Sequence, residues 1–299
     1  MKELTLPFIF KQINDVTIHA DFHLLLERIG LDCFDAFWNF DTGETIKQIP
    51  ERSLIRFSLD IHGEKTYFYL KRHNLEFAGI KKLLSFFCKT IAISQGIIEF
   101  NHICDLKNHC IETVIPVAAG EKFFGPFKAA SFLLTRDVSP YISLEYFLEE
   151  KPDFFSGEKG LERKNILIKE LALLARKMHT SGVNHRDFNA THILLLYDHS
   201  SNHASDIPKL ALFDLQRVDK KKFLRFFWTI KSMAGLIYTL PKHLFNETDR
   251  YSLFLSYKEG KKLNALDKLQ WHMIKKKIIR IQTHTKKSSK RKNKNHAFL

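Results

Sequence analysis

The residues best suited to chemistry lie in two short segments of the second half of the chain. The first is the turn His185-Arg186-Asp187, which a predicted helix precedes and an apolar predicted strand over 192–197 follows. The second is Asp214, which closes the next predicted strand over 209–213. An H-R-D turn followed by a strand, a loop, a strand and an aspartate is the order of catalytic groups in kinases. The pattern predicts phosphoryl transfer, because one acid orients the attacking hydroxyl and the other holds Mg²⁺ on the ATP phosphates.

Strands are predicted to dominate the first half of the chain. Residues 53–60 and 65–71 both alternate apolar and polar side chains, and His62-Gly63-Glu64 between them is typical of a hairpin turn. Shorter strands and one helix complete this part: strands at 37–41, 112–117 and 131–135, and a helix at 97–110 that begins near Glu99. Residues 136–140 are predicted to be a connector.

Helices are predicted beyond the connector. Leu167, Leu171, Leu174 and Met178 recur at helical spacing, and Gly182 follows them as a stop signal. Three further helices are predicted, at 221–240, 249–257 and 263–281. The order indicates an α+β chain with a two-lobed protein-kinase-like fold. Its parts are a strand-rich N-lobe at 1–138, a mostly helical C-lobe at 139–284 and a disordered basic tail at 285–299.

Over about residues 30–240, the chain resembles the lipopolysaccharide inner-core sugar kinases, the Kdo/heptose kinase family. Four stretches carry the resemblance: YFYLKRH (67–73), IIEFNHICDL (97–106), GVNHRDFNATHILL (182–195) and LALFDLQRV (210–218). The family has a histidine five residues after the turn aspartate, here His192, and a D-L-[HQ]-R motif, here Asp214-Leu215-Gln216-Arg217. The resemblance implies ATP and Mg²⁺ as cofactors. It implies as acceptor a Kdo or heptose hydroxyl of a lipid A–core molecule, at the inner face of the inner membrane.

The nucleotide-binding residues are predicted in the strand-rich part. Lys71 ends a predicted strand and is expected to contact the α- and β-phosphates, with Glu99 on the following helix as its ion-pair partner. Lys71 as a surface lysine, and Glu64 or Glu76 as its partner, are the alternatives. No G-x-G-x-x-G precedes Lys71, and Gly43 is the only glycine in the predicted nucleotide-covering turn. Gly43 and other backbone amides are therefore expected to cover the phosphates.

The catalytic turn supplies the remaining candidates. Asp187 is the predicted base and Asp214 the predicted magnesium ligand, whereas Arg186 is either catalytic or a brace for the loop. His192 stands where a second metal ligand is expected, but imidazole suits Mg²⁺ less well than oxygen does. The alternative is that His192 braces the loop and Asn189 supplies the oxygen ligand.

Two features depart from the family pattern. The predicted helix at 221–240 carries Lys231-Ser232-Met233, where the resemblance leads us to expect Lys-Asp-Leu with an acid that supports the catalytic loop. No A-P-E follows Asp214, which leaves little room for a peptide-docking segment and argues against a protein kinase. Two alternatives stay open: a non-catalytic kinase-like protein that binds an anionic membrane or nucleic acid, and a kinase for another small hydroxylated molecule.

Positive charge is concentrated at the C-terminal end. Residues 261–299 hold thirteen Lys or Arg and one acid, Asp267, a formal +12 of the chain's +14. Apolar residues recur at roughly helical spacing over 266–281, interrupted by Lys277, and six basic residues follow at 286–294. This segment predicts an anionic inner-membrane surface as partner, and a solvated, solubilising tail is the alternative. No nucleic acid is expected, because Phe298 is the one aromatic residue of the 285–299 tail.

The cysteines favour a reducing, cytoplasmic setting. The four of them form no C-x-x-C pair, and the first residues have no signal-peptide pattern. His102, Cys104, His109 and Cys110 are close in sequence, but their spacing is not a recognised zinc pattern. They are expected to be buried thiols and surface histidines.

Overall fold

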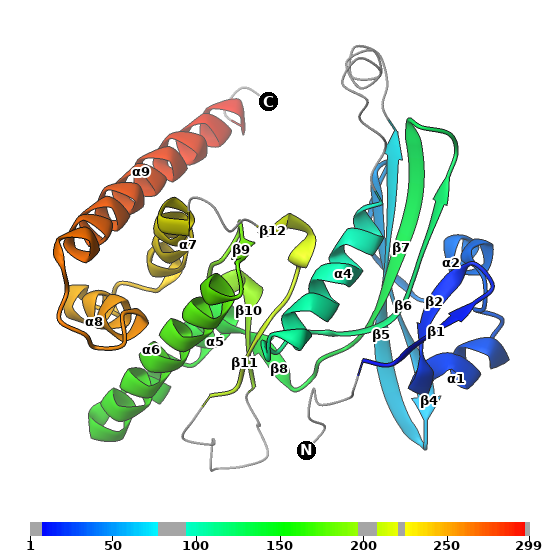
Figure 1. Cartoon of the computed structure of the whole chain (residues 1–299), viewed down its shortest axis with the longest axis horizontal. Helices are drawn as coiled ribbons and strands as arrows, with labels where there is room; N and C mark the ends of the chain where they lie inside the picture. The colour runs from blue at the N-terminus through cyan, green and yellow to red at the C-terminus, as the bar shows by residue number, and fades with distance from the viewer. Residues whose placement is uncertain (1–7, 77–93, 197–207, 221–224, 297–299) are drawn as a thin grey trace. The chain divides into compact units, whose positions relative to one another are not determined.

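The computed structural model describes residues 8–76, 94–196, 208–220 and 225–296, with side chains as far as residue 286 (Figure 1). The chain divides into two compact units. Unit 1 comprises Met1–Ser139 and Asp214–Gln216, and unit 2 comprises Pro140–Phe213 and Arg217–Leu299. The division falls one residue after the predicted lobe boundary. The short segment Asp214–Gln216 belongs to unit 1, although both of its flanking segments belong to unit 2.

Unit 1 is built on a seven-stranded antiparallel sheet in the order β1-β2-β6-β7-β5-β4-β3. Its strands are β1 (Phe10–Ile13), β2 (Val16–His19), β3 (Glu44–Ile49), β4 (Arg52–Ile61), β5 (Glu64–Glu76), β6 (Ile115–Phe123) and β7 (Lys128–Arg136). Its helices are η1 (Ala20–Phe22), α1 (His23–Arg28), α2 (Phe34–Asn39) and α4 (Gln95–Asn108).

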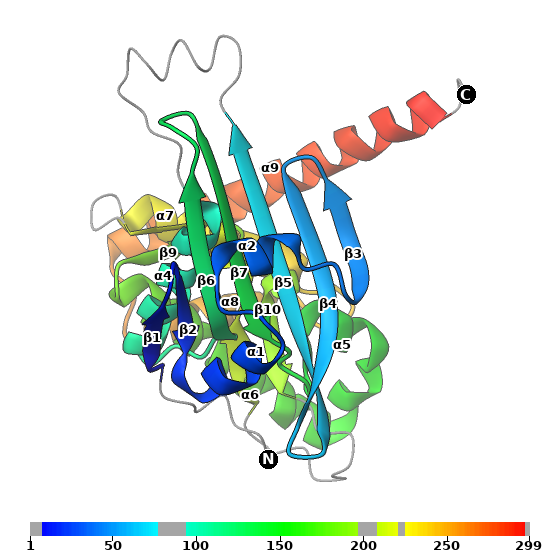
Figure 2. The same ribbon diagram turned by 90° about the vertical axis from the view of Figure 1, so that its right-hand side faces the viewer.

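The two faces of this sheet carry different helices. Phe132 of β7 stacks on Phe37 of α2, with ring centroids 4.3 Å apart. The preceding residue, Ser131, accepts a hydrogen bond of 3.0 Å from the backbone N–H of Gly96 in α4. Successive strand residues point to opposite faces, so α2 and α4 cover opposite faces. Figure 2 shows α1 and α2 in front of the sheet.

The predicted β4–β5 hairpin is confirmed, with residues 53–60 pairing with 65–72. His62 (φ 54°) and Gly63 (φ 79°) form its turn, and both angles lie in the region that two-residue hairpin turns require. The strand predicted at 37–41 is wrong, because Phe34–Asn39 is helix α2. Phe34 and Phe37 are one helical turn apart and are both buried, so the aromatic run fits a short helix against the sheet. The predicted helix at 97–110 begins earlier, at Gln95.

Unit 2 is mostly helical. Its helices are α5 (Leu144–Glu150), η2 (Pro152–Phe155), α6 (Gly157–Thr180), η3 (Ala190–His192), α7 (Arg225–Thr239), α8 (Glu247–Tyr257) and α9 (Ala265–His296). Its strands are β8 (Tyr141–Ser143), β9 (Val183–His185), β10 (Ile193–Leu196), β11 (Leu210–Leu212) and β12 (Val218–Lys220), and η4 (Leu215–Arg217) joins the two units. The predicted loop at 198–208 falls largely outside the described residues. Disorder was predicted from residue 285, but α9 continues to His296.

A buried polar network joins α6, α7 and α8. His179 contacts the Tyr257 hydroxyl through Nδ1 (3.1 Å) and Ser232 Oγ through Nε2 (2.6 Å). Ser232 donates to the carbonyl of Trp228 (2.9 Å), so His179 donates through Nε2 and accepts from Tyr257 through Nδ1. Burial lowers the pKa of His179 to about 3, so the ring is neutral. Ser232, where an acid was expected, is therefore a partner of this histidine.

Candidate active site

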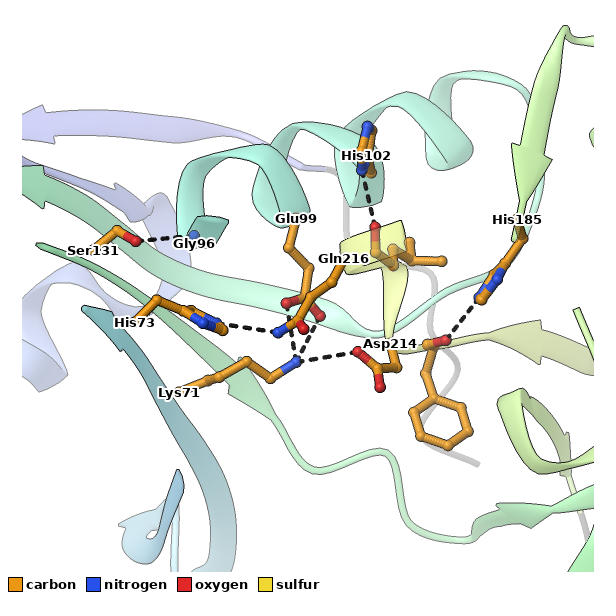
Figure 3. A network of polar contacts seen from close by, with 11 residues as sticks. Lys71, His73, Gly96, Glu99, His102, Ser131, His185, Asp214 and Gln216 are labelled. Atoms are coloured by element: carbon orange, nitrogen blue, oxygen red, sulfur yellow. Dashed lines mark hydrogen bonds and ion pairs between the residues drawn. The ribbon is translucent and has the colours of Figure 1, made fainter. Parts of the chain in front are cut away.

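Lys71 and Glu99 form a buried ion pair in unit 1 (Figure 3). Lys71 Nζ lies 2.8 Å from Glu99 Oε1 and 2.9 Å from Oε2. The two side chains are 14% and 4% exposed. Lys71 is on strand β5, and its side chain points to the face of the sheet that α4 covers. Glu99 is on α4. The predicted ion pair is present, whereas the contact of Lys71 with nucleotide phosphates stays a prediction.

Asp214 lies beside this pair. Its Oδ1 is 3.6 Å from Lys71 Nζ, and its side chain is 34% exposed. The backbone of Asp214 has φ 54°, a left-handed conformation that non-glycine residues adopt rarely and that is concentrated at functional sites. Lys71 thus bridges two carboxylates, one buried and one partly open to solvent. Mg²⁺ in kinases is held by one or two carboxylates and the substrate phosphates, and the donor type of Asp214 fits that ion.

Two histidines hold the Asp214 segment on unit 1. His102 Nδ1 lies 2.9 Å from the carbonyl oxygen of Leu215, to which it donates. The Gln216 amide donates to His73 Nε2 across 3.1 Å. Burial, with the nearby charge of Lys71, lowers the pKa of His73 to about 3, so the ring is neutral and accepts this bond. Our sequence reasoning missed both anchors, although His102 is three residues after Glu99 and so shares its helix face.

The remaining members of the suspected His/Cys cluster do other things. Cys104 is half-buried, and burial raises the pKa of its thiol to about 11. His109 Nδ1 contacts the carbonyl of Asp105, and Cys110 is exposed at the end of α4. The expectation of buried thiols is therefore wrong for Cys110. Within the described residues, Cys33, Cys104 and Cys110 are free cysteines.

His185 braces the predicted catalytic turn in unit 2. It is 1% exposed, its Nε2 donates to the Phe213 carbonyl (3.3 Å), and its Nδ1 accepts from the Asp187 backbone N–H (3.2 Å). Both ring nitrogens are thereby used to position backbone. The first histidine of the motif connects the turn to the strand that leads into Asp214.

The two charged side chains of the turn, Arg186 and Asp187, form ion pairs near the surface. Arg217 Nη1 donates to both oxygens of Asp187, at 2.9 and 3.0 Å, with side chains 61% and 32% exposed. Arg186 donates to Asp219 through Nε (2.6 Å) and Nη2 (3.0 Å). The hydrogen bond and charge of Asp219 raise the pKa of Arg186 above its ordinary value. Neither Arg217 nor Asp219 was predicted as a partner, since each lies about thirty positions from the turn.

Asn189 and His192 stabilise the loop after the turn. Asn189 Oδ1 accepts from the backbone N–H groups of Thr191 (3.0 Å) and His192 (3.3 Å). His192 Nδ1 donates to the Asp187 carbonyl (2.8 Å). These contacts are the bracing role considered for His192. Within the described residues, no group of three or more His, Cys, Asp or Glu side chains could hold a metal ion. A metal contact by either residue stays a prediction.

Gly43 lies before β3, while the β3–β4 hairpin turns at residues 50–51. Its φ is 126°, and a Cβ there would approach the Arg56 carbonyl to 2.4 Å, so the backbone requires glycine. It lines a cavity of about 530 Å³ with Phe57, which stacks on Phe68. Phe68 and Lys71 are three residues apart on β5 and face opposite sides of the sheet. A nucleotide contact by Gly43 stays a prediction.

The comparison with known proteins establishes the family. The family description "Lipopolysaccharide kinase (Kdo/WaaP) family" matches residues 38–257. The chain belongs to this family. It is 31% identical, over 66% of its length and 71% of the relative's, to the lipopolysaccharide core heptose(I) kinase WaaP of Escherichia coli. It is 27% identical to the protein of the same name in Pseudomonas aeruginosa, over 70% of this chain and 74% of that one.

The fold is also that of a solved relative. The structure of WaaP in complex with acyl carrier protein matches 89% of this chain and 98% of its own, with a TM-score of 0.65 and 20% sequence identity. The predicted α+β, protein-kinase-like fold is confirmed. Family membership also confirms the predicted enzyme class, a kinase with an alcohol group as acceptor.

Proposed function

We propose that this enzyme uses Mg-ATP to phosphorylate a sugar hydroxyl of the lipopolysaccharide inner core. The observation that carries the proposal is the Lys71–Glu99 ion pair with Asp214 at 3.6 Å, the set of charges that kinases use to hold nucleotide. Of the two candidate acceptors, Kdo and heptose, the names of the curated relatives favour heptose. The acceptor is a lipid A–core molecule.

The residues divide the work as follows. Lys71, held by Glu99, binds the α- and β-phosphates, and Asp214 holds the metal ion. Bound Mg²⁺ supplies positive charge that offsets the charge developing on the transferred phosphoryl group. Asp187 orients the acceptor hydroxyl and accepts its proton, and His185 and Asn189 keep the loop of Asp187 in place. Arg217 must release at least one Asp187 oxygen for this, and the exposure of the pair makes such an exchange inexpensive.

The test is mass spectrometry of lipid A–core from cells with and without the gene. We expect the core to lose one phosphate when the gene is absent, to regain it with the wild-type gene and not to regain it with Asp187→Asn. Fragmentation of the sugar chain then distinguishes heptose from Kdo. An unchanged phosphate pattern, together with no turnover of Mg-ATP by the purified chain, would favour the non-catalytic alternative.

We also propose that the end of α9 tethers the enzyme to the cytoplasmic face of the inner membrane. Within the described part of the chain, no helix is both long and apolar enough to cross a bilayer. Residues 286–294 contribute six basic side chains, each worth about 1 kcal/mol at most near an anionic leaflet. Together they support weak, salt-sensitive attachment beside a lipid-anchored acceptor.

Vesicle sedimentation tests the tether. The full chain is compared with a chain truncated after His284 and with a full-length variant in which the six basic residues at 286–294 are glutamine. We expect both changes to abolish binding to vesicles with anionic lipid, and raised salt to release the wild type. Equal binding by all three chains, or salt-insensitive binding, would leave residues 286–294 as a solubilising segment.

A further inference from the structure

Positive charge exceeds negative charge around Asp187. Arg186 and Arg217 flank the β9–β12 ladder, and the backbone N–H of Arg186 donates to the Arg217 carbonyl across 2.9 Å. Each guanidinium uses one carboxylate, Asp219 for Arg186 and Asp187 for Arg217. The two ion pairs have no net charge, so any nearby lysine adds net positive charge.

Lys231 of α7 adds a cation to this matched set. Its side chain is half-buried, and within the described residues no carboxylate lies within ion-pair distance of it; its recorded contact is the Trp228 ring, 5.7 Å away. Lys231 comes one helical turn before Gly235, where an added Cβ would lie 2.9 Å from the Phe188 carbonyl, so this face of α7 lies against the residue that follows Asp187. Burial lowers the pKa of Lys231, and the charges of Arg186 and Arg217 lower it further, whereas Asp187 raises it. A half-buried cation beside other cations is unfavourable without a compensating anion.

Lys277 of α9 adds a further positive charge. It is the residue that interrupts the apolar face of α9, and it comes one helical turn after Ile274, which is fully buried. Helices α7 and α9 pack together, and Gln270, two helical turns before Lys277 on the same face of α9, donates to the Phe226 carbonyl of α7 across 3.3 Å. The charge of Lys277 also lowers the pKa of Lys231. A lysine on the packed face of a helix, rather than on its open face, brings its charge close to the other helix.

We propose that Lys231 and Lys277, with Arg217, bind an anionic group of the acceptor next to Asp187. The group is a carboxylate or a phosphate, both of which match lysine and arginine donors. An anion bound there also gives Arg217 a second partner, so that Arg217 can move from Asp187 and free a carboxylate oxygen for the acceptor hydroxyl. The acceptor part of this proposal rests on the proposed function, whereas anion binding by the cluster does not.

Steady-state kinetics of the full chain tests the proposal. Lys231→Gln, Lys277→Gln and the double variant are compared with Lys242→Gln and Lys276→Gln, which neutralise exposed lysines just after α7 and on α9. We expect the double variant to raise KM for the acceptor by about 10-fold or more, because charged contacts contribute about 1.5–3 kcal/mol each. KM for ATP should stay at the control value, and the thermal unfolding midpoint should not fall below it, because removing an unpaired half-buried charge does not destabilise the fold.

Modified acceptors identify the anion. Acceptor is prepared from cells lacking the gene, and one portion is dephosphorylated while another has its carboxyl groups reduced. The wild type should lose affinity for one of the two portions. The double variant should be insensitive to that same modification, because it lacks the groups that recognise the removed charge.

Binding of small probes separates this proposal from the proposed function. Calorimetry with free Kdo and with inorganic phosphate should show binding to the wild type and to both controls, and about 10-fold weaker binding to the double variant. This result is expected even if lipid A–core proves not to be the acceptor. Equal probe binding by the double variant and the controls, or a rise in KM for ATP instead of acceptor, would overturn the proposal.

Discussion

Each unit contains an ion pair at the candidate site residues, and the two ion pairs differ in burial. In unit 1, Lys71 and Glu99 are 14% and 4% exposed, and the Lys71 Nζ contacts both Glu99 oxygens. In unit 2, Arg217 and Asp187 are 61% and 32% exposed, with similarly short distances. Distance alone therefore does not separate the two pairs, whereas solvent does.

The difference teaches which pair can change partners. Breaking a buried pair leaves an uncompensated charge in a low dielectric, so Lys71 and Glu99 hold one geometry. Water screens and competes for an exposed pair, whose net worth is about 0–1 kcal/mol. In the proposed function, the fixed geometry of Lys71 suits a nucleotide site, and the exchangeable pairing of Asp187 suits a site that accepts a new hydroxyl in each turnover.

Removing the acid of the exposed pair should have the largest effect on rate and little effect on folding. Asp187→Ala is expected to lower kcat by about 10³-fold, because a positioned base contributes about 10²–10⁴-fold. ATP affinity and the unfolding midpoint should remain near wild type. Activity within about tenfold of wild type would remove Asp187 from the role of base.

Asp214→Asn should separate the nucleotide site from the catalytic turn. The carboxylate next to Lys71 is lost, and we expect Mg²⁺-dependent ATP affinity to fall by about 10²-fold, since contacts to charged groups contribute about 1.5–3 kcal/mol. Calorimetry with ATP, with and without Mg²⁺, measures the difference. Unchanged Mg-ATP affinity would show that another group holds the metal ion.

Neutralising one partner of each pair tests the comparison directly. Glu99→Gln should cost about 3 kcal/mol of unfolding free energy, because it leaves Lys71 with Asp214 alone at 3.6 Å. Arg217→Gln should cost less than about 1 kcal/mol. Urea unfolding of both variants measures the contrast. Equal costs would mean that burial does not distinguish the pairs.

Acid should destabilise both units to a similar, smaller extent. His73 and His179 have pKa values of about 3 when folded, below the unfolded value of about 6.5, so the folded state binds fewer protons at mildly acidic pH. Their contribution is present above pH 6.5 and is lost as pH falls below it. From pH 7.5 to 5.5 each histidine should cost about 1 kcal/mol.

Single substitutions separate the two contributions. His73→Gln and His179→Gln should each reduce the loss of stability between pH 7.5 and 5.5, whereas His243→Gln, at an exposed position, should not. Urea unfolding at the two pH values gives the comparison. A pH dependence that none of the three variants changes would assign the acid sensitivity to other groups.

Local sequence patterns were sufficient to predict several structural features. His62-Gly63 predicted a hairpin because the turn needs positive φ at neighbouring residues, and the structure has it. The spacing of the H-R-D turn and the strand-terminal Asp214 predicted a catalytic region, and the catalytic roles of these residues stay a prediction. The aromatic run in α2 was misread as a strand, because Phe is common in both helices and strands and only packing against Phe132 decides between them.

By itself, the sequence determined the kinase-like order of elements and the chemical types of the candidate catalytic groups, because these depend on residue type and on spacing along the chain. It made Glu99 the expected partner of Lys71 but left Glu64 and Glu76 as alternatives, and the fold decided among them. Only the tertiary structure decided which side chains meet over long separations. His102 reaches the Leu215 carbonyl 113 positions away, and Arg217 reaches Asp187 30 positions away. Such contacts depend on how strands and helices pack, and any of several nearby arginines or histidines satisfies the local pattern equally well. Packing also buried the Lys71–Glu99 ion pair and left the Arg217–Asp187 ion pair exposed to solvent.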